Sequence, residues 1–182
     1  VLFRSPSPSP LEHPPVRDPR WHIASLMKQH RLFDAEERRD PRILKHMERA
    51  GHYEFGLNRR VINVGDGAAA RSIAELWRDG QEVRGWARYW AMLYGFVVAQ
   101  QERDAAVRQA SLIVRYEDLC DRAEATLAET FAHVGLELAP AEAATMATRL
   151  SKPSYYQLGF TADEEAVIAE ETGAVAAALG YR

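Results

Sequence analysis

Apolar side chains recur at helical spacing along most of the chain, and the clearest case lies near its middle. A stripe at i, i+3, i+4 and i+7 predicts an amphipathic helix there. The stripe comprises Trp86, Tyr89, Trp90, Leu93, Phe96, Val97 and Gln100. Its aromatic part is predicted to be core, with a pocket lining as the alternative. Gly80 and Gly85 are expected to separate this helix from an earlier one over residues 70–77.

Two Asp-Pro steps predict the starts of earlier helices. Asp18-Pro19 and Asp40-Pro41 each combine an N-capping residue with proline at the first helical position. The second helix is expected to end near Gly51, a typical C-terminal stop. Toward the carboxyl end, Pro140 opens a further helix and Thr161 caps a last one over residues 162–179.

Strand signals are few. Residues 111–116 (SLIVRY) form a short apolar, β-rich run that predicts a buried strand, and residues 61–64 are a weaker strand-like piece. The step Asn63-Val64-Gly65-Asp66-Gly67 is interpreted as a turn. The fold class expected from this pattern is an α/β domain, mostly helical and with few strands.

Composition divides the chain at residue 15. Residues 1–15 (VLFRSPSPSPLEHPP) form a proline- and serine-rich tail in which a packed core is not expected. We interpret this tail as disordered, with foreign sequence as an alternative origin. Residues 16–182 are expected to form a single partial domain, a length sufficient for a real core.

The charge and cysteine content exclude several classes of function. With a net charge of −3 the chain has no global basic footprint, so no general affinity for nucleic acid is expected. One cysteine, Cys120, excludes an internal disulfide framework and fits a reducing, cytoplasmic location. No apolar run reaches the ~18 residues of a membrane span. No ligand spacing points to a metal.

Arg17 and Ser25 are the first candidate site residues. Arg17 precedes the predicted helix start at Asp18, and Ser25 follows eight residues later. A guanidinium at such a junction suits phosphate, because it offers a planar fork of donors to which a hydroxyl can add another. A capped surface helix with solvated arginines is the alternative interpretation.

A second constellation follows the predicted strand, in Arg115-Tyr116-Glu117-Asp118-Leu119. Ligands in open α/β sheets collect at the carboxyl ends of strands, where Tyr116 would lie against a base. Alternatively, Glu117 and Asp118 only favour a helix amino terminus through its dipole.

In this order the two segments resemble the sulfotransferases that use 3′-phosphoadenosine-5′-phosphosulfate (PAPS). The motifs concerned are "RDPRxxxxS" from Arg17 and "RYEDL" from Arg115. Residues 123–136, the "SKPSYY" segment from Ser151 and the closing "LGY" are also similar to bacterial members. The likeness covers residues 16–182.

The resemblance implies a P-loop-like, three-layer α/β domain with PAPS as the donor substrate and no metal. Arg17 and Ser25 would bind the nucleotide 3′-phosphate, and Tyr116 would lie near the adenine. Lys152 and Ser154 are further candidates for the same pocket, with a solvated loop lysine as the alternative for Lys152. The acceptor would be a hydroxyl or amine of a small molecule, lipid or glycan.

The family's glycine-rich phosphosulfate loop has no counterpart here, since residues 63–67 carry no following lysine. The catalytic base is also not identified. We therefore expect an amino-terminally truncated fragment without transferase activity. The alternatives are a non-enzymatic helical interaction domain with a basic patch of Arg17, Arg20 and Lys28, and a kinase-like nucleotide domain, against which the missing loop counts more heavily.

Overall fold

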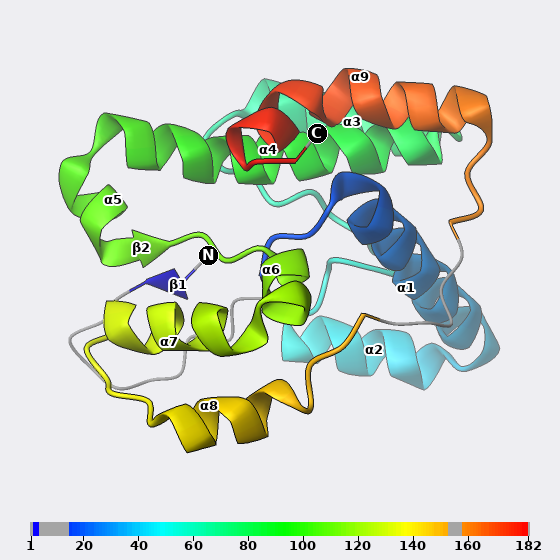
Figure 1. The fold of residues 1–182 in the computed structure, drawn as a ribbon. Coiled ribbons are helices and arrows are strands. Elements are labelled where there is room, and N and C mark those ends of the chain that lie inside the picture. Colours follow the sequence, from blue (N-terminus) through cyan, green and yellow to red (C-terminus); the bar gives the residue numbers. More distant parts are fainter. Residues whose placement is uncertain (1, 4–14, 153–157, 182) are drawn as a thin grey trace. The chain divides into compact units, whose positions relative to one another are not determined.

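The computed structural model describes residues 2–3, 15–152 and 158–181, which are predominantly helical (Figure 1). Nine helices lie within these residues. They are α1 (Pro19–Arg39), α2 (Pro41–Ala50), α3 (Gly67–Arg78), α4 (Glu82–Arg103), α5 (Ala105–Ala110), α6 (Tyr116–Asp121), α7 (Ala123–His133), α8 (Pro140–Ala147) and α9 (Ala162–Ala178).

The prediction of a P-loop-like α/β fold is wrong for the described residues, which are 70% helix and 2% strand. Two strands of two residues each, β1 (Leu2–Phe3) and β2 (Ser111–Leu112), pair antiparallel. The predicted strand 111–116 therefore stops early. Its end makes only an isolated parallel bridge, Val16 to Arg115. A longer ladder needs a donor from each partner, and Pro15, directly before Val16, has no N–H to give.

The remaining predicted strand piece, residues 61–64, has no strand structure. It leads into the turn at residues 63–67, as predicted. Asn63 Oδ1 accepts from the Gly65 amide at 2.9 Å, and Asp66 caps α3 by accepting from the amides of Ala68 and Ala69. Ile62 is 49% exposed, and no strand of the described residues pairs with this segment.

The helix boundaries predicted from capping residues are confirmed. The helices α1, α2 and α8 begin at Pro19, Pro41 and Pro140. Asp40 caps α2 through the Arg42 amide at 3.0 Å. At α9, Thr161 and Glu164 form a reciprocal capping box.

One predicted helix break is confirmed and the other is wrong. Gly80 lies between α3 and α4 with a φ of 76°. Gly85 lies inside α4, where an added Cβ would overlap the Trp77 indole. Because Gly85 has no side chain, α3 and α4 pack closely at this position.

The described chain divides into two compact units. The first comprises Val1–Asp18 and Val97–Gln157, and within it α7 packs against both α6 and α8. The second comprises Pro19–Phe96 and Leu158–Arg182, and within it α1 packs against α2 and α9. The boundary falls inside α4.

Aromatic residues form the core of the second unit, as the stripe in α4 predicts. Trp86, Tyr89 and Trp90 are 0%, 5% and 1% exposed. The ring centres of Trp77 and Trp86 are 4.6 Å apart. Their burial identifies Trp86, Tyr89 and Trp90 as core, whereas Phe96, farther along the stripe, is 41% exposed.

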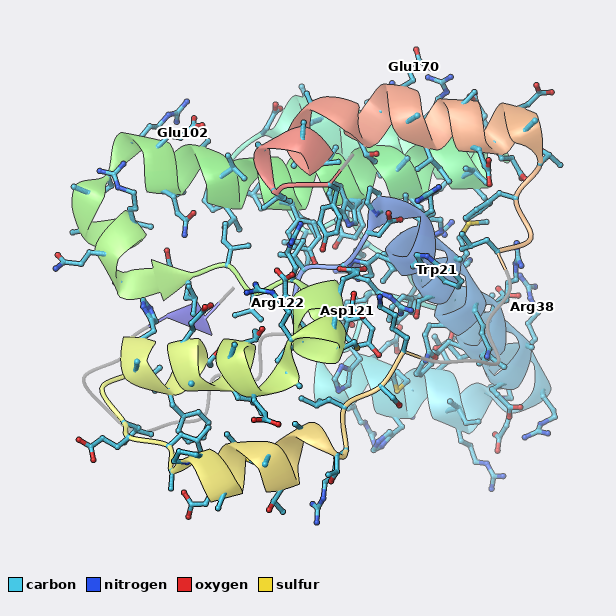
Figure 2. All side chains as sticks on the ribbon, in the orientation of Figure 1. Trp21, Arg38, Glu102, Asp121, Arg122 and Glu170 are labelled. Atoms are coloured by element: carbon cyan, nitrogen blue, oxygen red, sulfur yellow. The ribbon has the colours of Figure 1, made fainter. Side chains whose placement is uncertain are left out.

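Two arginines of α4 form ion pairs with glutamates of α9. Arg88 donates to Glu171 at 2.8 and 3.0 Å, and Arg84 reaches both Glu170 and Glu171. Figure 2 shows Glu170 at the outer side of α9, where 64% of its side chain is exposed. No helix in the described part of the chain is long and apolar enough to cross a membrane.

Candidate functional site

The candidate site lies in the first unit, where residues 16–18 meet residues 114–117. The Val16 amide donates to the Val114 carbonyl at 2.9 Å, and the Tyr116 amide donates to the Val16 carbonyl at 2.7 Å. These bonds make the parallel bridge between Val16 and Arg115. Two segments far apart in sequence therefore run side by side in the same direction, and each leads into a helix.

Burial and polarity explain why the junction forms there. Val16 and Val114 are 0% and 7% exposed, so both anchor the bridge in the apolar interior. Polar residues follow at once in both segments. Glu117 Oε1 accepts from the Asp18 amide at 3.0 Å, which holds the start of one motif against the start of the other.

Arg17 and Tyr116 are stacked. The guanidinium carbon of Arg17 lies 4.9 Å from the centre of the Tyr116 ring, within the range of a cation–π contact. The Tyr116 hydroxyl donates to the Ser151 carbonyl at 3.1 Å. Stacking engages the face of a guanidinium, whereas phosphate is bound through its N–H edge, so the two interactions are compatible.

Arg115 and Lys152 are each paired with a carboxylate. Arg115 makes a bidentate pair with Asp118 at 2.8 and 2.9 Å, and its hydrogen bonds lower the pKa of that carboxyl. Lys152 Nζ donates to Asp121 Oδ2 at 2.5 Å, and this hydrogen bond raises the pKa of Lys152. Asp121 lies at the end of α6 (Figure 2). A phosphate approaching Arg115 or Lys152 would compete with these carboxylates.

The predicted site residues are distributed unevenly. Arg17 and Tyr116 lie together at the junction, and Lys152 is the exposed partner of Asp121. Ser25 is half-buried on α1 in the second unit. Ser154 lies outside the described residues. The sequence interpretation missed the partners of the cations, although the three-residue spacing of Arg115 and Asp118 on a helix start signals such a pair.

Nothing in the described residues supplies the phosphosulfate loop. The only glycine-rich step singled out from the sequence is the Asp66-capped turn, whose capping carboxylate accepts from the first free amides of α3. An anion would need those same amides. No group of three His, Cys, Asp or Glu residues in the described ranges is arranged to hold a metal ion.

The contacts of the described histidines do not identify any one of them as the catalytic base. The Nδ1 atom of His22 lies 3.4 Å from the Tyr94 hydroxyl, and His30 Nδ1 accepts from the Gly56 amide. The Nε2 atom of His133 is buried without a hydrogen-bond partner. The catalytic base therefore stays unassigned.

Comparison of the chain with protein-family models, with curated proteins and with solved structures finds no match. The resemblance to sulfotransferases accordingly rests on the sequence motifs alone.

Proposed function

We propose that this chain binds a 3′-phosphorylated adenosine nucleotide, with Arg17 contacting the 3′-phosphate as the resemblance of its motifs to those of sulfotransferases implies. The proposal includes a cytoplasmic location, with which a single cysteine is compatible. One observation carries it. The two motifs of the resemblance, 99 residues apart, are joined by the bridge at Val16 and by the bond from the Asp18 amide to Glu117.

The chemistry of the junction supports a phosphate over other ligands at Arg17. A guanidinium presents paired donors to phosphate oxygens, and the contact with the Tyr116 ring holds the Arg17 side chain at the junction. Glu117 disfavours an anion at this junction. Its carboxylate already accepts from the Asp18 amide, and it adds a negative charge. We therefore expect modest affinity that depends strongly on Arg17.

Sulfuryl transfer is not expected of the chain on its own. The reaction would move the sulfuryl group from PAPS to a hydroxyl or amine, leaving adenosine 3′,5′-bisphosphate. Charge on the leaving phosphate must be stabilised by preorganised donors. The described residues offer no glycine-rich loop with a following cation for this purpose.

A thermal-shift titration tests the proposal. At 100 times its dissociation constant, adenosine 3′,5′-bisphosphate should stabilise the chain by about 2.7 kcal/mol. For a chain of this size that raises Tm by about 5–10 °C. Adenosine 5′-monophosphate should have much less effect, and Arg17→Ala should remove the difference. Arg49→Ala, an exposed change on α2, is the matched control. Equal shifts with both nucleotides, or no shift, would contradict the proposal.

A second candidate is a non-enzymatic helical interaction domain, which the helical fold favours. The described residues lack the open sheet at whose edge α/β proteins place nucleotides. Under this hypothesis Arg17 acts only through its stack on Tyr116. The same titration then gives no selectivity for the 3′-phosphate, while Arg17→Ala still lowers Tm.

A further inference from the structure

The second unit contains a cleft that the nucleotide proposal does not use. It lies between α1, α2 and the segment that follows α2, and has a volume of about 710 Å³. That volume is in the range of small-molecule sites. Its apolar lining includes Phe33, Met47 and Phe55, and its polar lining includes His46, His52 and Glu54.

Two phenylalanines, stacked on one another, give the cleft an aromatic wall. The rings of Phe33 and Phe55 have centres 5.9 Å apart and planes inclined by 17°. Phe55 also lies 6.1 Å from the buried Trp86 ring, which connects the wall to the core. An aromatic surface of this kind favours a planar ring as ligand.

The segment carrying Phe55 is held in place immediately after that residue. The Gly56 amide donates to His30 Nδ1 at 3.2 Å, and the Leu57 amide donates to Glu37 Oε2 at 2.7 Å. Glu37 is 3% exposed, so its carboxylate is committed to the interior of the unit. Both acceptors stand on α1, the helix that also carries Phe33. The two halves of the aromatic wall are thereby fixed to one helix, and a preformed wall lowers the entropic cost of binding.

The other end of the segment is fixed as well. The His52 amide donates to the Met47 carbonyl at 3.0 Å, following Gly51 at the end of α2. The Tyr53 hydroxyl donates to the Glu48 carbonyl at 3.1 Å. The cleft is therefore lined by a segment anchored on both sides.

A carboxylate gives the cleft its charge. Glu54 lies 3.8 Å from His52 Nδ1, and 46% of its side chain is exposed. Among the lining residues that the structure describes there is no lysine or arginine. The cleft therefore favours a cation and disfavours an anion.

We propose that this cleft binds a small planar aromatic amine in its protonated form, with the ring against Phe33 and Phe55 and the ammonium group toward Glu54. This site lies within the second unit, and its ligand has the opposite charge to the proposed nucleotide. Its failure and that of the nucleotide proposal are therefore separately observable.

Calorimetric titration of the full chain with tryptamine tests the proposal, because that molecule combines a planar ring and an ammonium group. Indole-3-acetate has the same ring with a carboxylate, and hexylamine has the ammonium group without a ring. We expect tryptamine to bind at least about tenfold more tightly than either compound. Indole-3-acetate loses the charge-assisted hydrogen bond and hexylamine loses the stacked ring, and each loss lowers affinity by about that factor. Equal affinities for tryptamine and indole-3-acetate would overturn the proposal.

Two variants assign the binding to this cleft. Glu54→Gln keeps the shape of the side chain and should reduce the preference for tryptamine over indole-3-acetate to about twofold or less. Glu75→Gln, on the exposed side of α3, should leave the preference unchanged. Phe33→Leu should weaken tryptamine and leave hexylamine unaffected, with the melting temperature checking the fold. If Phe33→Leu fails to fold, the result for Glu54→Gln tests the assignment by itself. An unchanged preference of Glu54→Gln for tryptamine over indole-3-acetate would show that the amine binds elsewhere.

Discussion

The guanidinium of Arg17 is stacked on the ring of Tyr116, 4.9 Å from its centre, although 99 residues separate the two in sequence. The stack sits at the Val16–Arg115 bridge, which makes one local structure out of two motifs. Tyr116 in turn donates to the Ser151 carbonyl, so a third segment meets the same residue. Three separate segments of the first unit therefore meet where its candidate ligand residues lie.

This stack should be measurable as a coupling energy. Arg17→Met and Tyr116→Leu each remove one partner, and the double variant removes both. Because the contact is only half-buried, we expect a coupling of about 0.5–1 kcal/mol in the free energy of unfolding. Urea unfolding of the four proteins measures it. Strictly additive effects would show that the stack contributes nothing to stability.

Gly56 should be far less tolerant of substitution than Gly51. Both have a positive φ, 79° and 76°, so alanine at either position costs about 1–2 kcal/mol of backbone strain. At Gly56 the added methyl group would also overlap the buried Glu37 carboxylate, whereas nothing lies within 4 Å at Gly51. Overpacking adds about 1–3 kcal/mol. Gly56→Ala should therefore have the lower urea midpoint, and equal midpoints would contradict the packing described here.

The ion pair between Arg59 and Glu82 should contribute more than the surface pairs. Arg59 is 11% exposed, makes bidentate bonds to Glu82 at 2.7 and 2.9 Å, and lies 4.0 Å from the centre of the Trp77 ring. Arg59→Met should destabilise the chain by about 2–3 kcal/mol, below the ~3–5 kcal/mol of fully buried pairs because Glu82 stays one-third exposed.

The matched control is the pair of Arg42 with Asp40, in which the arginine side chain is 90% exposed. Arg42→Met should shift the urea midpoint far less than Arg59→Met does, because solvent screens an exposed pair. Similar losses for the two variants, measured by urea unfolding, would show that the Arg59 pair is no better than a surface contact.

His30 should make stability depend on pH. Burial lowers its pKa below the ordinary 6.5, Arg59 lowers it further, and the carboxylates of Glu82 and Asp34 partly oppose this. The folded state therefore takes up the proton less readily than the unfolded chain. Its stabilising contribution is complete above pH 6.5 and is lost as pH falls from 6.5 toward the lower folded pKa. Protonated Nδ1 also cannot accept from the Gly56 amide.

Urea unfolding of wild type and His30→Gln between pH 7.5 and 5.0 measures this effect. A glutamine accepts a hydrogen bond but does not titrate, so the variant should lose less stability over the acidic part of the range. A His30→Gln curve parallel to wild type would exclude a shifted pKa at this position.

Capping chemistry made the helices predictable. Asp40 and Thr161 satisfy the first amides of their helices through contacts within three residues, and such local bonds are visible in sequence. The sheet was not predictable from residues 111–116 alone, because a strand depends on a partner elsewhere in the chain. Only Leu2–Phe3 and Val16 supply one within the described residues, and β2 is correspondingly short.

The candidate site was predictable only in part. Arg17 and Tyr116 were identified from their motifs, and the structure brings them into contact. The carboxylates that pair with Arg115 and Lys152 were not anticipated. Such pairs depend on the direction in which side chains point at the end of a helix. The periodicity of apolar residues in the sequence does not predict that direction.

The most direct measurement of the central claim is a calorimetric titration that compares adenosine 3′,5′-bisphosphate with adenosine 5′-monophosphate, on wild type and Arg17→Ala. We predict that wild type binds the bisphosphate at least about tenfold more tightly than the monophosphate, because one charge-assisted contact to phosphate contributes that much affinity. Arg17→Ala should bind the two nucleotides equally. Equal affinity of wild type for both nucleotides, or undiminished selectivity in Arg17→Ala, would contradict a 3′-phosphate site at the Arg17–Tyr116 stack.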